Sequence, residues 1–451
     1  MIIKNKQEIL SHGNIEGRKI ALDLIESGIN SINTYNIARK TIRVKNNILY
    51  VKKLRFNLTP IKRIFVFGGG KAAFPIAKVL EEVLNDKITC GVIIVKKGEK
   101  RRLKHIKVIE ASHPIPDENG LRGAIEILNM ASEVRKNDLV FFILTGGSSA
   151  LISLPANGIT LDNKRQVIEM LLKCGATVDE IHTVRRHISA IKGGRLAMRI
   201  HQAEIVNLFI MDEVSGEPWG PTVPDKTTFR DAIYVLKKYN VWRKIPGNIR
   251  NYLRRGLIDT KLETPKPKDF RNLRVRNVVL ADNMDLCVAI EKKAKEIGLN
   301  SLILTTKLNG ESREVGITLA SIAKSIEEYG KPIKPPCIIL AGGITTVKIG
   351  RRFGMGGPAQ EVALGASLKI SGSRKVVFSS IDTDGFDGFT DVAGGIVDGY
   401  TLDRAKKLDI DIFKYLIKHD SYTALRKLRD TIITGDTETD VMDLYISIVM
   451  K

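Results

Sequence analysis

Runs of β-branched and apolar residues alternate along the chain with stretches whose apolar residues recur at helical spacing. This alternation is typical of βαβ units, which build a largely parallel sheet covered by helices on both faces. The predicted strands are residues 63–67, 91–95, 139–144, 206–211, 278–281, 302–305, 337–341 and 376–380. The predicted helices are residues 73–84, 123–132, 162–174, 284–297 and 314–329. The pattern predicts the α/β fold class.

The 451 residues are too many for one simple core, because domains mostly run to roughly 100–200 residues. We therefore expect two or three packed units. The polar stretch at residues 262–270, LETPKPKDF, holds two prolines and several charges, which discourage regular structure. We expect it to connect an N-terminal domain, residues 1–262, to a smaller α/β C-terminal domain, residues 263–451.

Composition narrows the class of protein. Apolar runs fall short of the ~20 residues that cross a bilayer, and the first residues lack the apolar core of a signal peptide. We expect a cytoplasmic protein without a membrane partner. The four cysteines are far apart, with no C-x-x-C pair, so buried reduced thiols are expected rather than a cysteine-bound metal.

The net charge of +22 indicates either an anionic partner or simply a lysine- and arginine-rich surface. The chain has no basic tail, and aromatic residues make up only 6% of it. Recognition of RNA usually needs aromatic side chains on which bases stack. We therefore expect no nucleic-acid partner, and a phosphorylated small molecule remains the favoured anion.

The first candidate site follows the strand at residues 63–67. Gly68, Gly69 and Gly70 are followed by Lys71 and then by a predicted helix. Glycines let the backbone approach a ligand, and the lysine adds a positive charge at the start of the helix. The spacing matches neither a Rossmann fingerprint nor a P-loop. A tight strand-to-helix turn without a ligand is the alternative.

The second candidate follows the apolar strand at residues 139–144. Small residues and hydroxyls at a strand end form a cluster of donors suited to phosphate oxygens. A hydrolase serine would need the G-x-S-x-G pattern, and the second glycine is missing here. Phosphate binding is therefore preferred for Thr145, Gly146, Gly147, Ser148 and Ser149.

The third candidate is the basic stretch VRRHISAIKGGR, which contains Arg185, His187 and Lys192. If the stretch is helical, Arg185 and Lys192 lie two turns apart along one side. A solvated basic helix face is the alternative, and His187 by itself is more often a structural histidine than a catalyst.

The fourth candidate follows the strand at residues 376–380, where Asp382, Asp384, Asp387 and Asp391 lie among glycines. The spacing does not fit an EF-hand. It leaves a carboxylate-rich strand end that could bind Mg²⁺ directly or through water, or an Asp-Gly turn in which the carboxylates cap the backbone. A further turn at Gly342, Gly343 and Thr345 precedes a glycine-rich loop at residues 350–357.

These segments together resemble the glycerate 2-kinase family, whose C-terminal part is the MOFRL-type domain. The resemblance covers about residues 15–445 and rests on an ordered set of stretches: FGGGKAA, SHPIPDENG, LTGGSSALISLPANGITLDNK, VRRHISAIKGGRLA, GPTVPDKTTF, ETPKP, AGGITTVKIGRRFGMGGPAQE, SSIDTDGFDGFTDVAGG and TGDTETDVMDL. Each stretch is weak by itself, whereas their common order is specific. The resemblance implies a Rossmann-like N-terminal domain and an active site in the cleft between two domains.

The resemblance also implies a reaction in which the C2 hydroxyl of D-glycerate attacks the γ-phosphate of ATP in line, with Mg²⁺ or another divalent cation, to give 2-phosphoglycerate. Its setting would be carbohydrate metabolism, such as the Entner–Doudoroff pathway, and the enzyme a monomer or homodimer. The catalytic residues implied are Lys71, Arg185, Asp382 and Asp384, the two aspartates also as metal ligands. The substrate- and ATP-binding residues implied are Gly69, Gly70, His113, Thr145, Gly146, Gly147, Ser148, Ser149, Lys192, Gly342, Gly343, Thr345, Gly356, Gly357, Gln360 and Glu361.

The chain departs from the family pattern in places. Ser148 replaces a glycine of the usual triple-glycine turn, and Pro358-Ala359 stands where many members have Arg-Asn. The second change removes a cation, for which Arg351 or Arg352 could substitute. Two other functions remain as alternatives: a nicotinamide-dependent oxidoreductase of hydroxy acids, although its dinucleotide fingerprint is missing, and a basic nucleic-acid-binding protein.

Overall fold

The structure, a computed structural model, describes residues 2–98, 101–350 and 353–451. The chain forms two compact units that are not contiguous in sequence. Unit 2 consists of Thr34–Met211 and Glu217–Leu280. Unit 1 consists of the chain up to Asn33, the short segment Asp212–Gly216 and the segment Ala281–Lys451.

A six-stranded sheet is the centre of unit 2, with the strand order β6-β5-β4-β7-β8-β9. The first five strands in this order pair in parallel, and most of their residues are buried. Such burial on both faces explains the unbroken apolar runs in the sequence. The strands are β4 (Ile64–Gly69), β5 (Ile88–Lys96), β6 (Ile106–Ala111), β7 (Leu139–Leu144), β8 (Glu204–Ile210) and β9 (Arg274–Ala281).

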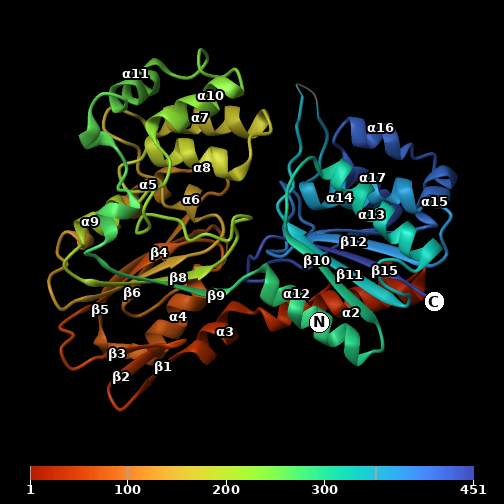
Figure 1. The fold of residues 1–451 in the computed structure, drawn as a ribbon, viewed down its shortest axis with the longest axis horizontal. Coiled ribbons are helices and arrows are strands. Elements are labelled where there is room, and N and C mark those ends of the chain that lie inside the picture. The colour runs from red at the N-terminus through yellow and green to blue at the C-terminus, as the bar shows by residue number, and fades with distance from the viewer. Residues whose placement is uncertain (1, 99–100, 351–352) are drawn as a thin grey trace. The chain divides into compact units, whose positions relative to one another are not determined.

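Helices cover both faces of this sheet (Figure 1). Helix α4 lies on one side with a small antiparallel sheet of order β1-β2-β3, and α5 lies on the other. The side chain of Asp117 caps α5 by accepting a hydrogen bond from the Gly120 N–H at 3.0 Å. The elements are β1 (Ile42–Lys45), β2 (Ile48–Val51), β3 (Leu54–Asn57), α3 (Thr34–Thr41), α4 (Ala73–Leu84), η1 (Asn85–Lys87), α5 (Glu118–Ala131), α6 (Ser148–Leu151) and α9 (Arg195–Arg199).

A group of helices with its own apolar core completes unit 2. Its helices are α7 (Leu161–Lys173), α8 (Val178–His187), α10 (Phe229–Lys238) and α11 (Gly247–Gly256). Buried residues from all four pack together, among them Val167, Val184, Leu236 and Leu253. Threonine side chains cap three of these helices: those of α7, α8 and α10.

Unit 1 has a mixed sheet of order β10-β11-β15-β12-β13-β14. Strand β15, near the end of the chain, lies between β11 and β12 and is antiparallel to both. The strands are β10 (Asn300–Leu308), β11 (Cys337–Gly343), β12 (Val376–Asp382), β13 (Gly394–Asp398), β14 (Thr431–Ile432) and β15 (Asp443–Val449).

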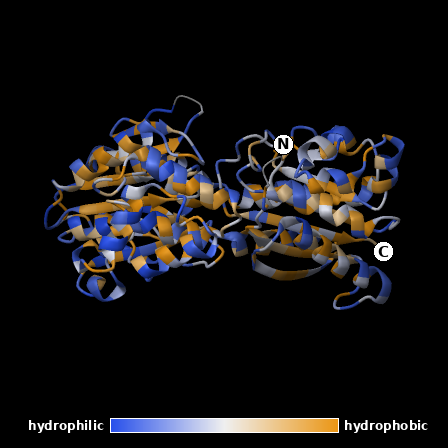
Figure 2. Ribbon diagram, turned by 90° about the horizontal axis from the view of Figure 1, so that it is seen from above, coloured by the Kyte–Doolittle hydropathy of each residue, from blue (hydrophilic) through white to orange (hydrophobic). Residues whose placement is uncertain are grey.

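Helices α2 and α12 cover one face of this second sheet, and α13 and α14 cover the other (Figure 1). The strands at the centre of each unit are mostly hydrophobic, whereas the helices turn hydrophilic residues outward (Figure 2). The helices are α1 (Lys6–Ile9), α2 (Ile15–Ser31), α12 (Asn283–Glu296), α13 (Ser312–Tyr329), α14 (Pro358–Ile370), α15 (Thr401–Lys407), α16 (Ile412–Ile417) and α17 (Ser421–Leu428). The expected α/β fold with two domains is confirmed.

The bounds of the units differ from the expected division after residue 262 because the first helices pack with the C-terminal part of the chain. Arg18 of α2 is buried and forms ion pairs with Asp398 at 2.5 Å and Asp430 at 2.8 Å. Exchanging such buried partners for water would be costly. The segment up to Asn33 therefore belongs to unit 1.

Residues 262–270, the expected connection between domains, instead lie within unit 2. They include the end of η2 (Thr260–Leu262) and η3 (Pro267–Phe270). Thr264 is buried and donates to Asp225 at 3.1 Å, and Glu263 contacts His187 Nε2 at 3.1 Å. The two prolines therefore lie in a segment that is packed into unit 2. His187 has a structural contact with this segment, which agrees with its interpretation as a structural histidine.

Candidate functional site

Two glycine turns at the carboxyl ends of β4 and β7 are bonded to each other. The Lys71 N–H donates to the Gly146 carbonyl at 2.8 Å, and the Ala72 N–H donates to Thr145 Oγ1 at 3.1 Å. Gly70 has a φ of +139°, and the Thr145 side chain occupies the space where a Cβ would lie. A tight strand-to-helix turn therefore explains why a glycine stands at position 70. The same turn fixes the position of the Lys71 backbone.

The ring of His113 lies against the second turn. Gly147 has a φ of +80°, and a Cβ there would lie 2.9 Å from His113 Cδ2 and 3.3 Å from Lys71 Cγ. Burial, with the nearby charges of Lys71, Lys96 and Arg185, holds the pKa of His113 well below its usual value. The imidazole is thus neutral and offers one N–H donor beside a cationic group.

Ser148 and Ser149 begin the short helix α6. The Ser148 side chain is buried, and its hydroxyl has no hydrogen-bond partner within the described residues. Ser149 is half-buried. The structure therefore brings Lys71, His113 and the residue 145–149 turn together, where neighbouring parallel strands end.

The condition that one helix runs through Arg185 and Lys192 is not met, because α8 ends at His187. Ser189 leaves the helix to pair with Pro155, and its hydroxyl accepts the Lys192 N–H at 3.3 Å. The two cations nevertheless lie close together. Burial comes first among the causes that lower the pKa of Lys192 far below its usual value, followed by the charges of Lys164, Arg185 and Arg186.

Lys164 of α7 is a further cation of this group, which the sequence interpretation missed. Its side chain is only 1% exposed, and its Nζ has no hydrogen-bond partner within the part of the chain described. Burial and then the charge of Arg185 lower the pKa of Lys164 to about 7. Its spacing was a usable signal: Lys164 lies three, four and seven residues before Val167, Ile168 and Leu171, all buried on the same helix face.

The candidate residues of unit 1 follow β12. The Asp384 N–H donates to Asp382 Oδ1 at 3.1 Å, and the Phe386 N–H donates to Asp384 Oδ1 at 2.7 Å. These are the capping contacts of the alternative interpretation. Asp382 lies opposite Asp443 of β15 in the sheet register.

Two further buried carboxylates adjoin this turn: Asp387, which the sequence placed in the carboxylate-rich strand end, and Asp443, which the sequence interpretation missed. Asp387 accepts the Ala359 and Gln360 N–H groups at 3.1 and 2.7 Å, and also Gln360 Nε2 at 2.9 Å. Burial nonetheless raises the pKa of Asp387 to about 7 against those donors. Burial and then the charge of Asp387 raise the pKa of Asp443 well above its usual value.

The remaining predicted residues of unit 1 are mostly engaged in packing. Gly342 and Gly343 lie against Asn283 and the Leu308 backbone, and Gly356 and Gly357 against Ser421 and Asp387. Thr345 Oγ1 accepts from Ser312 at 2.9 Å, Gln360 anchors Asp387, and His419 lies 3.0 Å from buried Glu361. Arg351 and Arg352, the suggested substitutes for the missing family arginine, lie outside the described residues.

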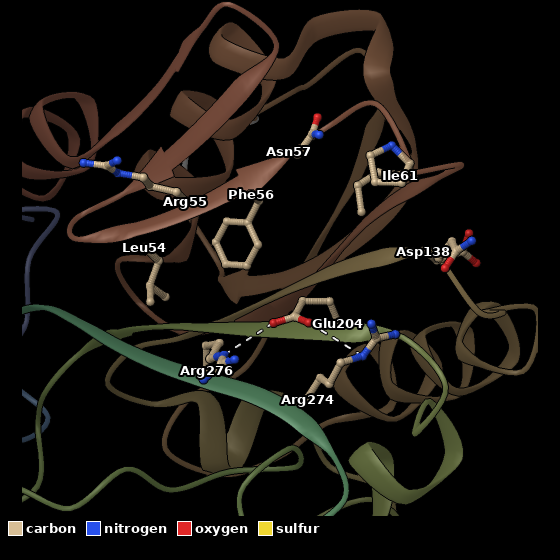
Figure 3. Close-up of a pocket in the computed structure, with 11 residues that line it drawn as sticks. Leu54, Arg55, Phe56, Asn57, Ile61, Asp138, Glu204, Arg274 and Arg276 are labelled. Atoms are coloured by element: carbon tan, nitrogen blue, oxygen red, sulfur yellow. Dashed lines mark hydrogen bonds and ion pairs between the residues drawn. The ribbon is translucent and has the colours of Figure 1, made fainter.

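A cavity of about 530 Å³ in unit 2 lies away from this site (Figure 3). It is lined by Asn137, Asp138, Glu204 and Arg274, which precede or begin strands, and by residues of β3. Parallel strands place their beginnings at the edge opposite to their carboxyl ends, so none of the predicted site residues lines it. Glu204 joins Arg274 and Arg276 across its floor.

Comparison with known proteins gives matches over both units. A family model described as a domain of unknown function (DUF4147) matches residues 20–254, and the MOFRL family model matches residues 337–443. A glycerate 2-kinase from Pyrococcus horikoshii is 40% identical over 96% of this chain and 97% of its own. A D-glycerate 2-kinase from Thermotoga maritima is 35% identical over 96% of this chain and 98% of its own.

The chain belongs to the glycerate 2-kinase family.

Solved structures agree with this membership. A glycerate kinase from Thermotoga maritima superposes with a TM-score of 0.75 at 34% identity, covering 96% of this chain and 99% of that one. A protein from Pyrococcus horikoshii gives a TM-score of 0.74 at 40% identity, covering 96% and 98%. The resemblance drawn from the ordered motifs is thus confirmed. No helix among the described residues is both long and apolar enough to cross a membrane.

Proposed function

We propose that this glycerate 2-kinase family member transfers the γ-phosphoryl group of ATP to the C2 hydroxyl of D-glycerate, giving 2-phosphoglycerate. The observation that carries the proposal is the group of buried and half-buried cations in unit 2, Lys71, Lys164, Arg185 and Lys192, in a chain 40% identical to a glycerate 2-kinase over almost its whole length. Both reactants are anions, and phosphoryl transfer requires mainly positioning and neutralisation of charge.

In unit 2 the roles follow from charge and position. Lys71 is the half-buried cation held beside the donor-rich turn, and we assign it to the substrate carboxylate or the transferring phosphoryl group. Arg185 and Lys192 would bind further anionic oxygens. The neutral imidazole of His113 and the hydroxyls of Ser148 and Ser149 would donate hydrogen bonds to phosphate oxygens.

In unit 1 the carboxylates of Asp382 and Asp384 fit Mg²⁺, which takes oxygen ligands and often only one or two carboxylates alongside phosphate oxygens. No group of three or more His, Cys, Asp or Glu side chains that could hold a metal occurs among the described residues. The nucleotide would therefore supply the other ligands. When bound, the ion neutralises charge on the phosphate oxygens. Whichever aspartate does not bind the ion would orient the C2 hydroxyl.

A coupled assay tests this function. The purified chain is mixed with D-glycerate and Mg-ATP, release of ADP is followed, and the product is passed to enolase, which consumes the 2-phosphate and not the 3-phosphate. The proposal expects ADP release that depends on D-glycerate and a product that enolase consumes. ADP release without enolase turnover would contradict the position of transfer, and absence of both signals would contradict the function.

A hydroxypyruvate reductase is the second candidate, because a relative from Agrobacterium vitis, 36% identical over 85% of this chain and 87% of its own, is named a putative hydroxypyruvate reductase. The turn after β4, GGGK, lacks the glycine spacing that brings a dinucleotide pyrophosphate onto a helix. Mixing the protein with NADH or NADPH and hydroxypyruvate separates the two functions. Loss of the 340 nm absorbance would favour the reductase.

A further inference from the structure

Lys164 is placed where the fold alone gives no reason for a charge. Its helix, α7, packs Val167, Ile168 and Leu171 into the helical core of unit 2, and Lys164 shares their face with 1% of its side chain exposed. Its Nζ has no hydrogen-bond partner within the described residues. Burial of an ammonium without a partner costs several kcal/mol, whereas an apolar side chain of the same length would not.

The charged groups that face Lys164 do not offset the free energy lost on burying its ammonium group. Arg185 of α8 lowers its pKa, and Lys164 in turn joins Arg185 and Arg186 in lowering that of Lys192. Arg186 is itself balanced by Asp225 at 3.2 Å. His182, also on α8, is held neutral by burial and by the charges of Arg185, Arg186 and Lys192.

The acidic neighbours of Lys164 along the chain are engaged elsewhere. Asp162 pairs with Arg165 at 2.5 Å on the solvent side of α7. Asp179 of α8 acts on the pKa of His182, in the direction opposite to the cations. Among the described residues, no carboxylate contributes to the pKa of either Lys164 or Lys192. Within the described residues, the chain therefore supplies no anion to partner the Lys164 ammonium group.

We propose that Lys164 is a further ligand-binding cation of the unit 2 site and that it binds an anionic oxygen of a reactant together with Arg185 and Lys192. This inference deepens the proposed function and rests on it for the reactants: the oxygen belongs either to the carboxylate of D-glycerate or to a phosphate group. Two converging ammonium groups and a guanidinium suit either, since both present several acceptor oxygens.

Binding of such an anion couples to a proton. Without the ligand, Lys164 loses its proton as the pH rises through about 7. A bound anion favours the charged form and raises that pKa, so that above pH 7 the protein takes up a proton when it binds. The affinity therefore weakens by up to about tenfold per pH unit above pH 7.

Calorimetric titration measures both quantities. D-glycerate and inorganic phosphate are titrated in separate experiments at pH 6.5, 7.5 and 8.5, in two buffers that differ in ionisation enthalpy, so that the difference in heat gives the protons taken up. The variants are Lys164→Met, Lys164→Arg and the control Lys173→Met, which removes an exposed lysine at the far end of the same helix.

The wild type and Lys173→Met should take up more than about half a proton per bound anion at pH 7.5. Lys164→Met should bind about 10- to 100-fold more weakly at pH 6.5, because one charged hydrogen bond is removed, and should take up fewer protons than the wild type. Lys164→Arg, whose charge does not titrate in this range, should bind the anion and also take up fewer protons than the wild type. The anion whose binding weakens in Lys164→Met identifies the group that Lys164 binds. Weaker binding of D-glycerate indicates the carboxylate, and weaker binding of phosphate indicates the phosphoryl group.

Equal affinity and equal proton uptake in wild type and Lys164→Met would overturn the inference, as would a wild type that binds neither anion or binds without proton uptake. The last outcome covers the case in which Lys164→Met does not fold, because it needs only the wild type. Failure of the proposed function is distinct: a wild type that shows the binding and uptake but transfers no phosphoryl group keeps the role of Lys164 in anion binding and contradicts the kinase.

Discussion

Two buried cations of this protein differ in whether other side chains neutralise their charge. In unit 1, Arg18 is fully buried and meets Asp398 and Asp430 within 2.5 and 2.8 Å. In unit 2, Lys164 is also buried, and the charge that acts on its pKa is the cation Arg185. One charge is balanced by the chain itself, and the other is not.

The pKa shifts record this difference. Although burial acts against it, Asp430 and Asp398 raise the pKa of Arg18, and Arg18 helps to lower the pKa of Asp430 to about 2. Burial and a neighbouring cation instead lower the pKa of Lys164 to about 7. A compensated buried charge belongs to the architecture, whereas an uncompensated one marks a place where the fold gives up stability and a ligand can restore it.

The largest expected effect separates activity from stability at the unit 2 site. Lys71→Ala should lower kcat/KM about 10²- to 10⁴-fold, since removal of a cation that neutralises developing charge costs several kcal/mol of barrier. Its melting temperature should stay within about 2 °C of the wild type, because Lys71 is only half-buried. The measurement is the ADP-release assay alongside calorimetry. Lys78→Ala, at an exposed position of α4, is the control, and near-normal activity of Lys71→Ala would remove that lysine from the mechanism.

The next effect concerns the balanced cation. Arg18→Met should lower the free energy of unfolding by about 3–5 kcal/mol, because it leaves the buried Asp398 without its cationic partner and removes one of the two guanidinium groups that contact Asp430. Urea denaturation measures the change, with Lys19→Met on the exposed face of the same helix as control. A loss no larger than that of the control would show that Arg18 does not hold the N-terminal segment in unit 1.

The unbalanced cation should respond in the opposite direction. Lys164→Met should raise the stability of the ligand-free protein by about 1–4 kcal/mol, since an apolar side chain replaces an isolated buried charge. The pKa of Lys164 is about 7 in the fold and 10.5 otherwise, so the wild type loses stability from this group as the pH falls from 10.5 to 7.

The gain from Lys164→Met should therefore be larger at pH 6.5 than at pH 9. Thermal unfolding of wild type and variant at the two pH values, without ligands, measures it. A variant that is less stable than the wild type at both pH values would mean that Lys164 is a structural partner after all.

The smallest expected effect concerns the turn at residues 145–149, which lies against His113 and Lys71. Gly147→Ala should cost about 1–2 kcal/mol of stability, because the residue has a positive φ and the new methyl would crowd His113. Gly158→Ala is matched to it: its φ of +81° is the same within a degree, and a Cβ there meets open space. Both should lose stability, but activity should fall only in Gly147→Ala. Equal activity in the two would separate the His113 contact from catalysis.

Local patterns in the sequence were enough to locate eight of the strands and five of the helices. The eight predicted strands correspond to β4, β5, β7, β8, β9, β10, β11 and β12, and the five predicted helices to α4, α5, α7, α12 and α13. Apolar runs and helical periodicity report burial directly, so these elements could be read from the chain. The strands of the small sheet β1-β2-β3 were missed, because each has only four residues and much of their surface is exposed.

By itself, the sequence determined that glycines, hydroxyls and charges gather at the ends of buried strands, and its ordered motifs determined the family. These are properties of neighbouring residues and of their order along the chain. Tertiary structure decided which charges have partners. Arg18 meets Asp398 and Asp430, which lie 380 and 412 residues away, only through packing between distant segments. The same packing places Lys164 beside other cations, and so it sets the free energies of these charges.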